Sequence, residues 1–225
     1  MSSAFEEFLT QFKKTGSEKA DGYSRDAFIG LTELEKKIVF DYLVSEIPWE
    51  IEWLFFLDPQ RAAVVAKKKE AEERGNRHAH VYLIQKQLVN QCGEMEYQQH
   101  MIDDYHNYID ELKPLVVDAI AQTPKTSSSI NFFKDLVLVE THQDSLASAS
   151  INFLNSMGFV RGTETEKEIY LRLLKELRCD NDAIKIGAVD YILKNGKNIL
   201  AESFNIFSER INYQFFIKLQ FLNGF

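Results

Sequence analysis

The chain has 225 residues, 45% of them hydrophobic, and a formal net charge of −8. This length and hydrophobic content can support a folded core, whereas 10 Gly and 4 Pro are few for a fold of many short strands. Acidic surfaces repel nucleic-acid phosphates and anionic lipids, so the charge argues against binding to nucleic acids or membranes. Apolar runs also stay short of the roughly 18 to 20 residues that span a bilayer.

The cysteines and the N-terminus bear on the cellular compartment. Cys92 and Cys179 form no disulfide framework, which favours a reducing environment. Residues 1–14, MSSAFEEFLTQFKK, lack the basic segment and following apolar segment of a signal peptide. We therefore expect a cytoplasmic protein.

The first expected helix covers residues 3–14, because its apolar side chains recur at spacings of three and four. These side chains are Phe5, Phe8, Leu9 and Phe12. The sequence ADGYSRD, residues 20–26, is rich in turn-forming residues and ends this helix.

A second helix is expected after Thr32, since Thr32 and Glu35 have the spacing of a capping box. Its expected apolar face consists of Leu34, Ile38, Tyr42 and Leu43. Pro48 suits the first turn of the next helix, with Ser45 as a candidate cap.

The segment IPWEIEWLFFLDP, residues 47–59, contains both tryptophans of the chain. Trp49, Trp53 and Phe56 are spaced by four and three residues, so they share one face of a helix. Stripes of this kind usually face a core, and we expect these three side chains to be buried. Asp58 followed by Pro59 is typical of the start of a further helix.

Helices are expected over residues 78–92 and 94–112, the second ending before Pro114. Residues 130–143, INFFKDLVLVETHQ, fit a strand or a helix, but an isolated strand would lack a partner, so we expect a helix. Residues 145–159 predict a helix that ends at Gly158. The aromatic stretch 198–225 is expected to add one or two closing helices.

This succession of helices with short connections predicts an all-α fold. We expect stacked antiparallel helical hairpins, arranged as an irregular α-solenoid or a helical bundle, in a single domain over residues 1–225.

Residues 164–194, ETEKEIYLRLLKELRCDNDAIKIGAVDYILK, resemble a HEAT-type helical repeat. The first helix has an apolar stripe formed by Ile169, Leu173, Leu174 and Leu177. A turn with Asp180 and Asp182 follows, and the second helix then carries Lys185, Gly187 and Ala188. The resemblance implies a stacked helical pair in which turn acids cap the second helix and small residues allow close packing. It also implies binding to other macromolecules.

The net negative charge lies entirely in residues 1–112, which hold 13 Lys+Arg and 21 Asp+Glu, whereas residues 113–225 hold 13 of each. Two windows in the acidic half contain acids but no Lys or Arg, residues 38–60 and 87–112. The first window includes Glu50 and Glu52. Such windows favour a basic protein as the partner.

The second window contains EMEYQQHMIDDYHNYIDEL, residues 94–112, in which three tyrosines are interleaved with six acids. Tyrosine can act as a rigid anchor for a partner, and acids can steer a basic protein toward it. The residues expected to contact a partner are Glu50, Glu52, Glu96, Tyr97, Asp103, Asp104, Tyr105 and Tyr108. The ordinary alternative is a solvated helix face.

The same segment also admits a metal site. Glu96, His100 and Asp104 are four residues apart, so on a helix they share a face and could ligate a divalent ion, with His78 or His80 completing the set. A metal-dependent hydrolase is therefore an alternative hypothesis. The sequence contains no P-loop, nucleophile elbow or dinucleotide fingerprint, and we expect no cofactor.

An acidic all-α chain of this size without a catalytic motif resembles, by composition, the bacterial immunity proteins. This resemblance implies a non-enzymatic inhibitor that neutralises a basic cognate toxin through an acidic surface. A scaffold subunit of a larger assembly is a further alternative.

Overall fold

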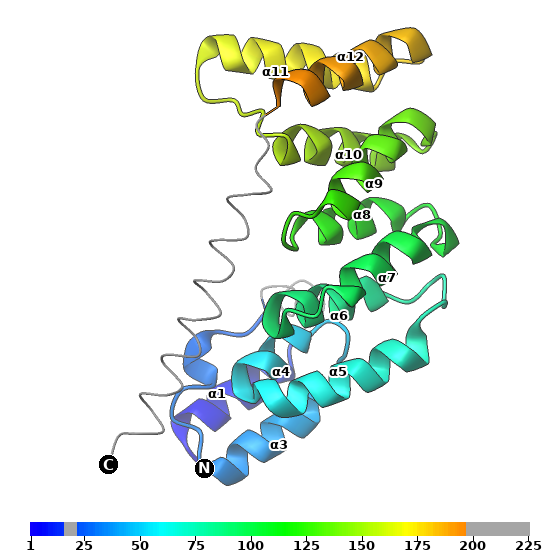
Figure 1. Cartoon of the computed structure of the whole chain (residues 1–225). Coiled ribbons are helices and arrows are strands. Elements are labelled where there is room, and N and C mark those ends of the chain that lie inside the picture. Colours follow the sequence, from blue (N-terminus) through cyan, green and yellow to red (C-terminus); the bar gives the residue numbers. More distant parts are fainter. Residues whose placement is uncertain (16–21, 197–225) are drawn as a thin grey trace, which may run out of the picture. The chain divides into compact units, whose positions relative to one another are not determined.

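The computed structural model describes residues 1–15 and 22–196 (Figure 1). Over these residues it contains eleven α-helices, three short helical turns labelled η1 to η3, and no β-strand. The all-α prediction is therefore confirmed. No helix in the described part is long and apolar enough to cross a membrane. The closing helices expected within residues 198–225 lie outside the described residues.

The chain separates into two compact units. Among the described residues, unit 1 comprises those of Met1–Arg74 and Ala79–Gly93, and unit 2 comprises Gly75–His78 and residues 94–196. The change from acidic to neutral sequence at residue 112 therefore falls inside unit 2. The single domain expected over residues 1–225 stays a prediction.

Unit 1 is a set of short helices whose start signals can be read in the sequence. Its elements are α1 (Ser3–Phe12), η1 (Arg25–Ala27), α3 (Glu33–Val44), α4 (Ile51–Leu57), α5 (Pro59–Glu73), α6 (Val81–Gln87) and η2 (Leu88–Cys92). Thr32 and Glu35 form the expected capping box at α3. The Asp58 carboxylate accepts the Arg61 N–H at 3.1 Å, as expected for the cap of α5.

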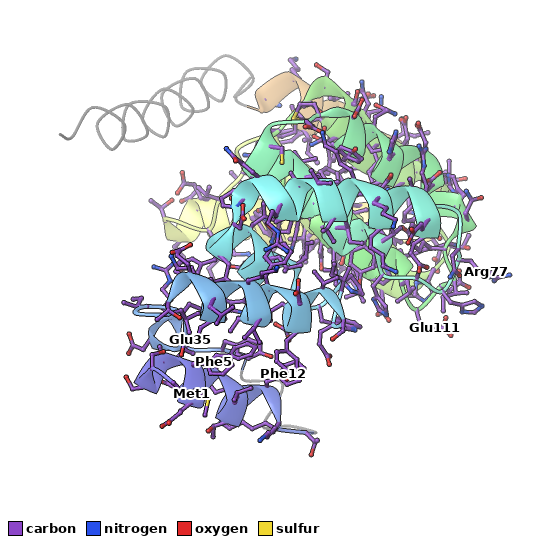
Figure 2. The ribbon with its side chains drawn as sticks, turned by 90° about the horizontal axis from the view of Figure 1, so that it is seen from below. Met1, Phe5, Phe12, Glu35, Arg77 and Glu111 are labelled. Atoms are coloured by element: carbon purple, nitrogen blue, oxygen red, sulfur yellow. The ribbon has the colours of Figure 1, made fainter. Side chains whose placement is uncertain are left out.

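The buried face of α3 differs from the expected one. Leu43 is buried as expected, but Leu34, Ile38 and Tyr42 are 71%, 37% and 41% exposed, respectively. The other buried members of this face are Glu35, Val39 and Phe40. Glu35 explains the difference, because its carboxylate accepts the Ser2 N–H at 2.7 Å and so holds this side of α3 against α1 (Figure 2).

The aromatic stripe of residues 47–59 also lies differently. α4 begins at Ile51, after turns over residues 45–50, so Pro48 lies outside the helix. Trp49 and Phe56 are 61% and 46% exposed, so the prediction that they belong to the core is wrong. Trp53, the third member of the stripe, is half-buried. The side chains that α4 buries are Ile51, Leu54 and Phe55. A helix this short can bury only one of its two apolar stripes, and the stripe of Ile51, Leu54 and Phe55 is the buried one.

Unit 2 contains α7 (Glu96–Asp104), η3 (Tyr105–Asn107), α8 (Lys113–Ala121), α9 (Ser127–Val139), α10 (Gln143–Ser156), α11 (Glu164–Leu177) and α12 (Asp182–Asn195). The single helix expected over residues 94–112 is therefore broken. Tyr108 is extended, with φ −70° and ψ 151°. Pro114 does not stop a helix but lies in the first turn of α8, where its missing N–H has no helical partner to lose.

The other signals in unit 2 are largely confirmed. Residues 130–139 are helical, and Thr126 forms a capping box with Ser129 at the start of α9. Gly158 follows α10 with φ +80°, as expected at a helix end. The cap of α12 is Asn181, whose side chain accepts the Ile184 N–H at 3.2 Å, and not one of the neighbouring acids.

The helices of unit 2 form three stacked pairs, α7–α8, α9–α10 and α11–α12 (Figure 1). α9 packs between α7 and α12, while α10 packs between α8 and α11. In a regular solenoid the first helices of successive pairs stack on each other. Here α11 stacks on α10, so the order reverses at the third pair. Stacked helical hairpins are confirmed, and their arrangement is irregular.

Candidate partner-binding site

The acids expected on α7 lie at the surface, but the tyrosines do not. Glu96 and Asp103 are exposed and Asp104 is half-buried. The exposed fractions of Tyr97, Tyr105 and Tyr108 are 7%, 0% and 5%. Tyr97, Met101 and Tyr105 recur every fourth residue, and this stripe forms the side of α7–η3 that faces α8 and α9. Burial leaves these tyrosines almost no side-chain surface to offer to a partner.

The first acidic window belongs to the other unit. Glu50 is only 8% exposed and stands at the N-terminal end of α4, whereas Glu52 is exposed in the first turn. Neither residue is part of unit 2. The acids of the first window therefore belong to unit 1, whereas those of the second window belong to unit 2.

The geometry does not assemble the alternative metal site. Glu96 and His100 lie on α7 and Asp104 is its last residue. Among the described side chains, no group of three or more His, Cys, Asp or Glu residues is close enough to hold a metal ion. Their helical spacing alone therefore does not bring these three side chains together as ligands.

A groove with a volume of about 390 Å³ lies between α7–η3 and α9, and we call it the α7–α9 groove. One wall consists of Gln99, Ile102 and His106. The opposite wall consists of Ser128, Asn131, Phe132, Asp135, Leu136 and Val139. The groove thus combines an apolar floor with amide, hydroxyl and carboxylate groups, as binding sites for chain segments commonly do.

Gln98 holds the two walls together. Its Nε2 donates to Thr123 Oγ1 at 2.6 Å and to the Pro124 carbonyl oxygen at 2.8 Å. The Thr126 hydroxyl donates to Gln98 Oε1 at 2.6 Å. Gln98 is 2% exposed, so these bonds tie the buried side of α7 to the residues that lead into α9. This buried amide is thus one of the connections between the two walls of the groove.

The groove carries negative charge. Asp135 lies in its wall, and Asp103 stands one turn from Gln99, whose Nε2 donates to Asp103 Oδ1 at 2.7 Å. Among the described residues that line the groove there is no Lys or Arg. Lys134 lies beside it, with Nζ 3.3 Å from Asp135 Oδ1, and partly offsets this charge.

No protein-family model, curated protein or solved structure matches this chain. The function of the groove therefore rests on its own geometry and charge.

A second hollow in unit 2 has a volume of about 580 Å³ and a mostly polar lining. The titratable side chains that line it are Arg77, His78, His106, Asp110, Glu111 and Lys113, of which Arg77 and Glu111 are labelled in Figure 2. Lys113 Nζ donates to Asp110 Oδ1 at 2.7 Å. This hydrogen bond and the Lys113 charge hold the pKa of Asp110 below its usual value, with smaller contributions from His142 and Arg77. The positive charges of Arg77 and Lys113 are thus largely balanced by the negative charges of Asp110 and Glu111 in the same hollow.

Beside this hollow, Tyr105 and Glu140 form a hydrogen-bonded network. The Tyr105 hydroxyl donates to Glu140 Oε2 at 2.6 Å, and Glu140 Oε1 accepts the N–H groups of Thr141 and His142 at 2.8 and 2.9 Å. Burial acts to raise the pKa of Glu140, but these hydrogen bonds outweigh it and lower the pKa. Burial, followed by the bond to Glu140, raises the pKa of Tyr105, so its hydroxyl stays protonated at neutral pH.

His142 and Ser145 add a pair that could be mistaken for a nucleophile and its base. His142 Nδ1 and Ser145 Oγ are 3.0 Å apart. Ser145 is 0% exposed, however, so a substrate cannot reach its hydroxyl. The pair belongs to the network that orders the start of α10.

Proposed function

We propose that this chain is a non-enzymatic binding protein whose α7–α9 groove receives an extended segment of a basic protein. The supporting observation is the composition of the groove, which joins apolar side chains to amide and hydroxyl groups and to one carboxylate, Asp135, without a lining Lys or Arg among the described residues. A surface of this kind can hold apolar side chains while it attracts cations.

Each class of residue has a separate part in this proposal. Ile102, Phe132 and Val139 provide the apolar contacts for alternate side chains of the segment. Gln99 and Asn131 carry amides that can both donate to and accept from an extended backbone. Asp103 and Asp135 attract Lys or Arg side chains at the rim, an effect that acts mainly on the association rate.

An immunity-type inhibitor of a basic toxin is the specific form of this function that we propose. It is supported by the formal charge of −8 and by the acidic groove in an all-α chain. In such an inhibitor the acidic groove would complement the positive charge of the toxin. The acidic residues that we assign to this surface are Glu96, Asp103 and Asp104 on α7, joined by Asp135 on α9.

Peptide display tests the groove directly, because it requires only the chain itself and not its natural partner. Random peptides of twelve residues are selected against the full chain, and bound peptides are sequenced. We expect the selected peptides to combine Lys or Arg with apolar residues and to lose binding when Asn131→Arg fills the groove with a cation. The matched control is Gln143→Arg, an exposed position in the first turn of α10. Peptides without basic residues, or equal binding to both variants, would contradict the proposal.

A further inference from the structure

The α7–α9 groove and the second hollow of unit 2, which we call the charged hollow, meet at one side chain. His106 is exposed and lines both of them. One wall of the groove runs from Gln99 to His106, a rise of about 10 Å, which an extended chain covers with about three residues. A bound segment only slightly longer than this therefore extends past His106 into the charged hollow.

The charged hollow differs from the groove because cations line it. The groove has no lining Lys or Arg among the described residues, whereas Arg77 and Lys113 line the hollow. Lys113 is already engaged, since its Nζ donates to Asp110 Oδ1 at 2.7 Å. No carboxylate oxygen of the described residues lies within 4 Å of the Arg77 guanidinium, and its charge makes only a minor contribution at Asp110. Arg77 can therefore offer its N–H donors to a ligand.

Backbone contacts position Arg77 at this hollow. The Ile109 N–H donates to the Arg77 carbonyl oxygen at 3.3 Å, which ties the turn Gly75–His78 to the segment after η3. Within the turn, the Asn76 side chain accepts the His78 N–H at 3.2 Å. The Arg77 side chain itself is exposed (Figure 2), so a ligand can reach its guanidinium.

Glu111 supplies the complementary charge. It is exposed and lines the same hollow as Arg77 (Figure 2). Among the described residues, no Lys, Arg or His nitrogen lies within 4 Å of its carboxylate. With Lys113 and Asp110 paired to each other, a ligand that matches both Arg77 and Glu111 carries a carboxylate and a cation close together. A C-terminal Lys or Arg has this chemistry, because its α-carboxylate and its side-chain cation belong to one residue.

We propose that the segment bound in the α7–α9 groove is the C-terminal end of the basic partner, with a last Lys or Arg held in the charged hollow. Arg77 binds the α-carboxylate through two N–H groups, the geometry that guanidinium groups favour. Glu111 binds the side-chain cation of the same residue. His78 and His106 also line the hollow and can donate to the carboxylate. This inference rests on the proposed function, because it names the part of a basic partner that enters the groove.

An Asp or Glu within the partner chain could also supply a carboxylate to Arg77. Such a residue would match Glu111 only if a Lys or Arg stood next to it. The terminal residue brings both charges by itself, so it fits the pair of Arg77 and Glu111 better. The test therefore includes a peptide whose carboxylate comes from a side chain.

A peptide library with free C-termini tests the proposal on the full chain. Peptides of eight randomised residues are attached through their N-termini, selected for binding and sequenced. We expect Lys or Arg at the last position, with basic and apolar residues before it. Selection against Arg77→Gln/Glu111→Gln should keep the earlier pattern and lose the preference at the last position. The matched control is Arg178→Gln/Glu168→Gln, which removes the same two charges at exposed positions in and after α11.

Amidation isolates the contribution of the terminal carboxylate. A selected peptide is made with a free C-terminus, with an amidated C-terminus, and with an amidated Asp added after its last residue. Fluorescence anisotropy then measures the affinity of each. We expect amidation to weaken binding at least about five-fold in the wild type and in Arg178→Gln, but less than about two-fold in Arg77→Gln.

The outcomes separate this inference from the proposed function. Equal affinity of the free and amidated peptides for the wild type, or full affinity of the peptide with the amidated Asp, would overturn the terminal carboxylate and leave the groove in place. An equal effect of amidation in Arg77→Gln and Arg178→Gln would overturn the role of Arg77. A selection that enriches no basic peptide would contradict the proposed function and this inference together. An effect of amidation that is lost only in Arg77→Gln would support the inference.

Discussion

The Tyr105 hydroxyl donates a 2.6 Å hydrogen bond to Glu140 Oε2 and joins two segments that are 35 residues apart. The donor is fully buried and its pKa is raised by burial, so the bond persists over the physiological pH range. Glu140 at the same time accepts two N–H groups at the start of α10. One carboxylate therefore connects η3, the end of α9 and the start of α10.

Removing this hydroxyl should destabilise the protein. Tyr105→Phe leaves the backbone bonds of Glu140 intact but removes one hydrogen bond to a charged group, and we expect a loss of about 1.5–3 kcal/mol in the free energy of unfolding. Urea denaturation monitored by circular dichroism measures it. Tyr191→Phe is the control, because Tyr191 is 37% exposed, and an equal loss in both variants would refute the role of the Glu140 bond.

Gln98 should affect both stability and binding. Gln98→Ala removes three hydrogen bonds in a buried site, and we expect a loss of about 2–3 kcal/mol in the free energy of unfolding. Because Gln98 holds the groove walls together, the affinity for a selected peptide should also fall. Gln99→Ala is the comparison, since its exposed side chain should affect binding but change stability by less than about 0.5 kcal/mol. Full affinity in folded Gln98→Ala would contradict the positioning role.

Glu35 should contribute to acid stability. Hydrogen bonds from the Ser2 and Thr32 N–H groups lower its pKa from 4.5 to about 2. The group binds a proton more readily in the unfolded chain, so its stabilising contribution is present above pH 4.5 and is lost as the pH falls toward 2. Urea denaturation between these pH values should show a smaller dependence of stability on pH in Glu35→Gln than in the wild type. An unchanged slope would refute this assignment.

Local signals of the chain were predicted well because they act over a few residues. Thr32, Asp58 and Gly158 start or end helices through bonds and dihedral angles that their own positions determine. The choice of buried face was less predictable, because α3 and α4 each offer two apolar stripes. Glu35 and its bond to Ser2, 33 residues away, decide the orientation of α3.

The candidate site was predictable only in part. The excess of acids on residues 94–112 was visible in the sequence, and Glu96 and Asp103 are exposed. The tyrosines among them are buried. Tyr97 and Tyr105 lie on the side of α7–η3 that faces α8 and α9, because their spacing follows the helical repeat. The groove joins residues 99–106 to residues 128–139, and no local pattern connects two segments separated in this way.

Reversing the charge of the groove should slow the association of a basic ligand. Asp103→Lys with Asp135→Lys changes the net charge by +4, and we expect an association rate about ten-fold lower with little change in the free energy of unfolding. Glu168→Lys with Asp180→Lys makes the same change at exposed positions around α11. This control should keep the wild-type rate within about two-fold.

The most direct test of the groove is the salt dependence of that association rate, measured by stopped-flow fluorescence with a labelled peptide from the display selection. We predict that the rate for the wild type and for Glu168→Lys/Asp180→Lys falls steeply as salt is raised, because the screening length shortens to about 8 Å at physiological ionic strength. For Asp103→Lys/Asp135→Lys it should be low and nearly independent of salt. Identical salt dependence in all three proteins would contradict a basic ligand in the α7–α9 groove.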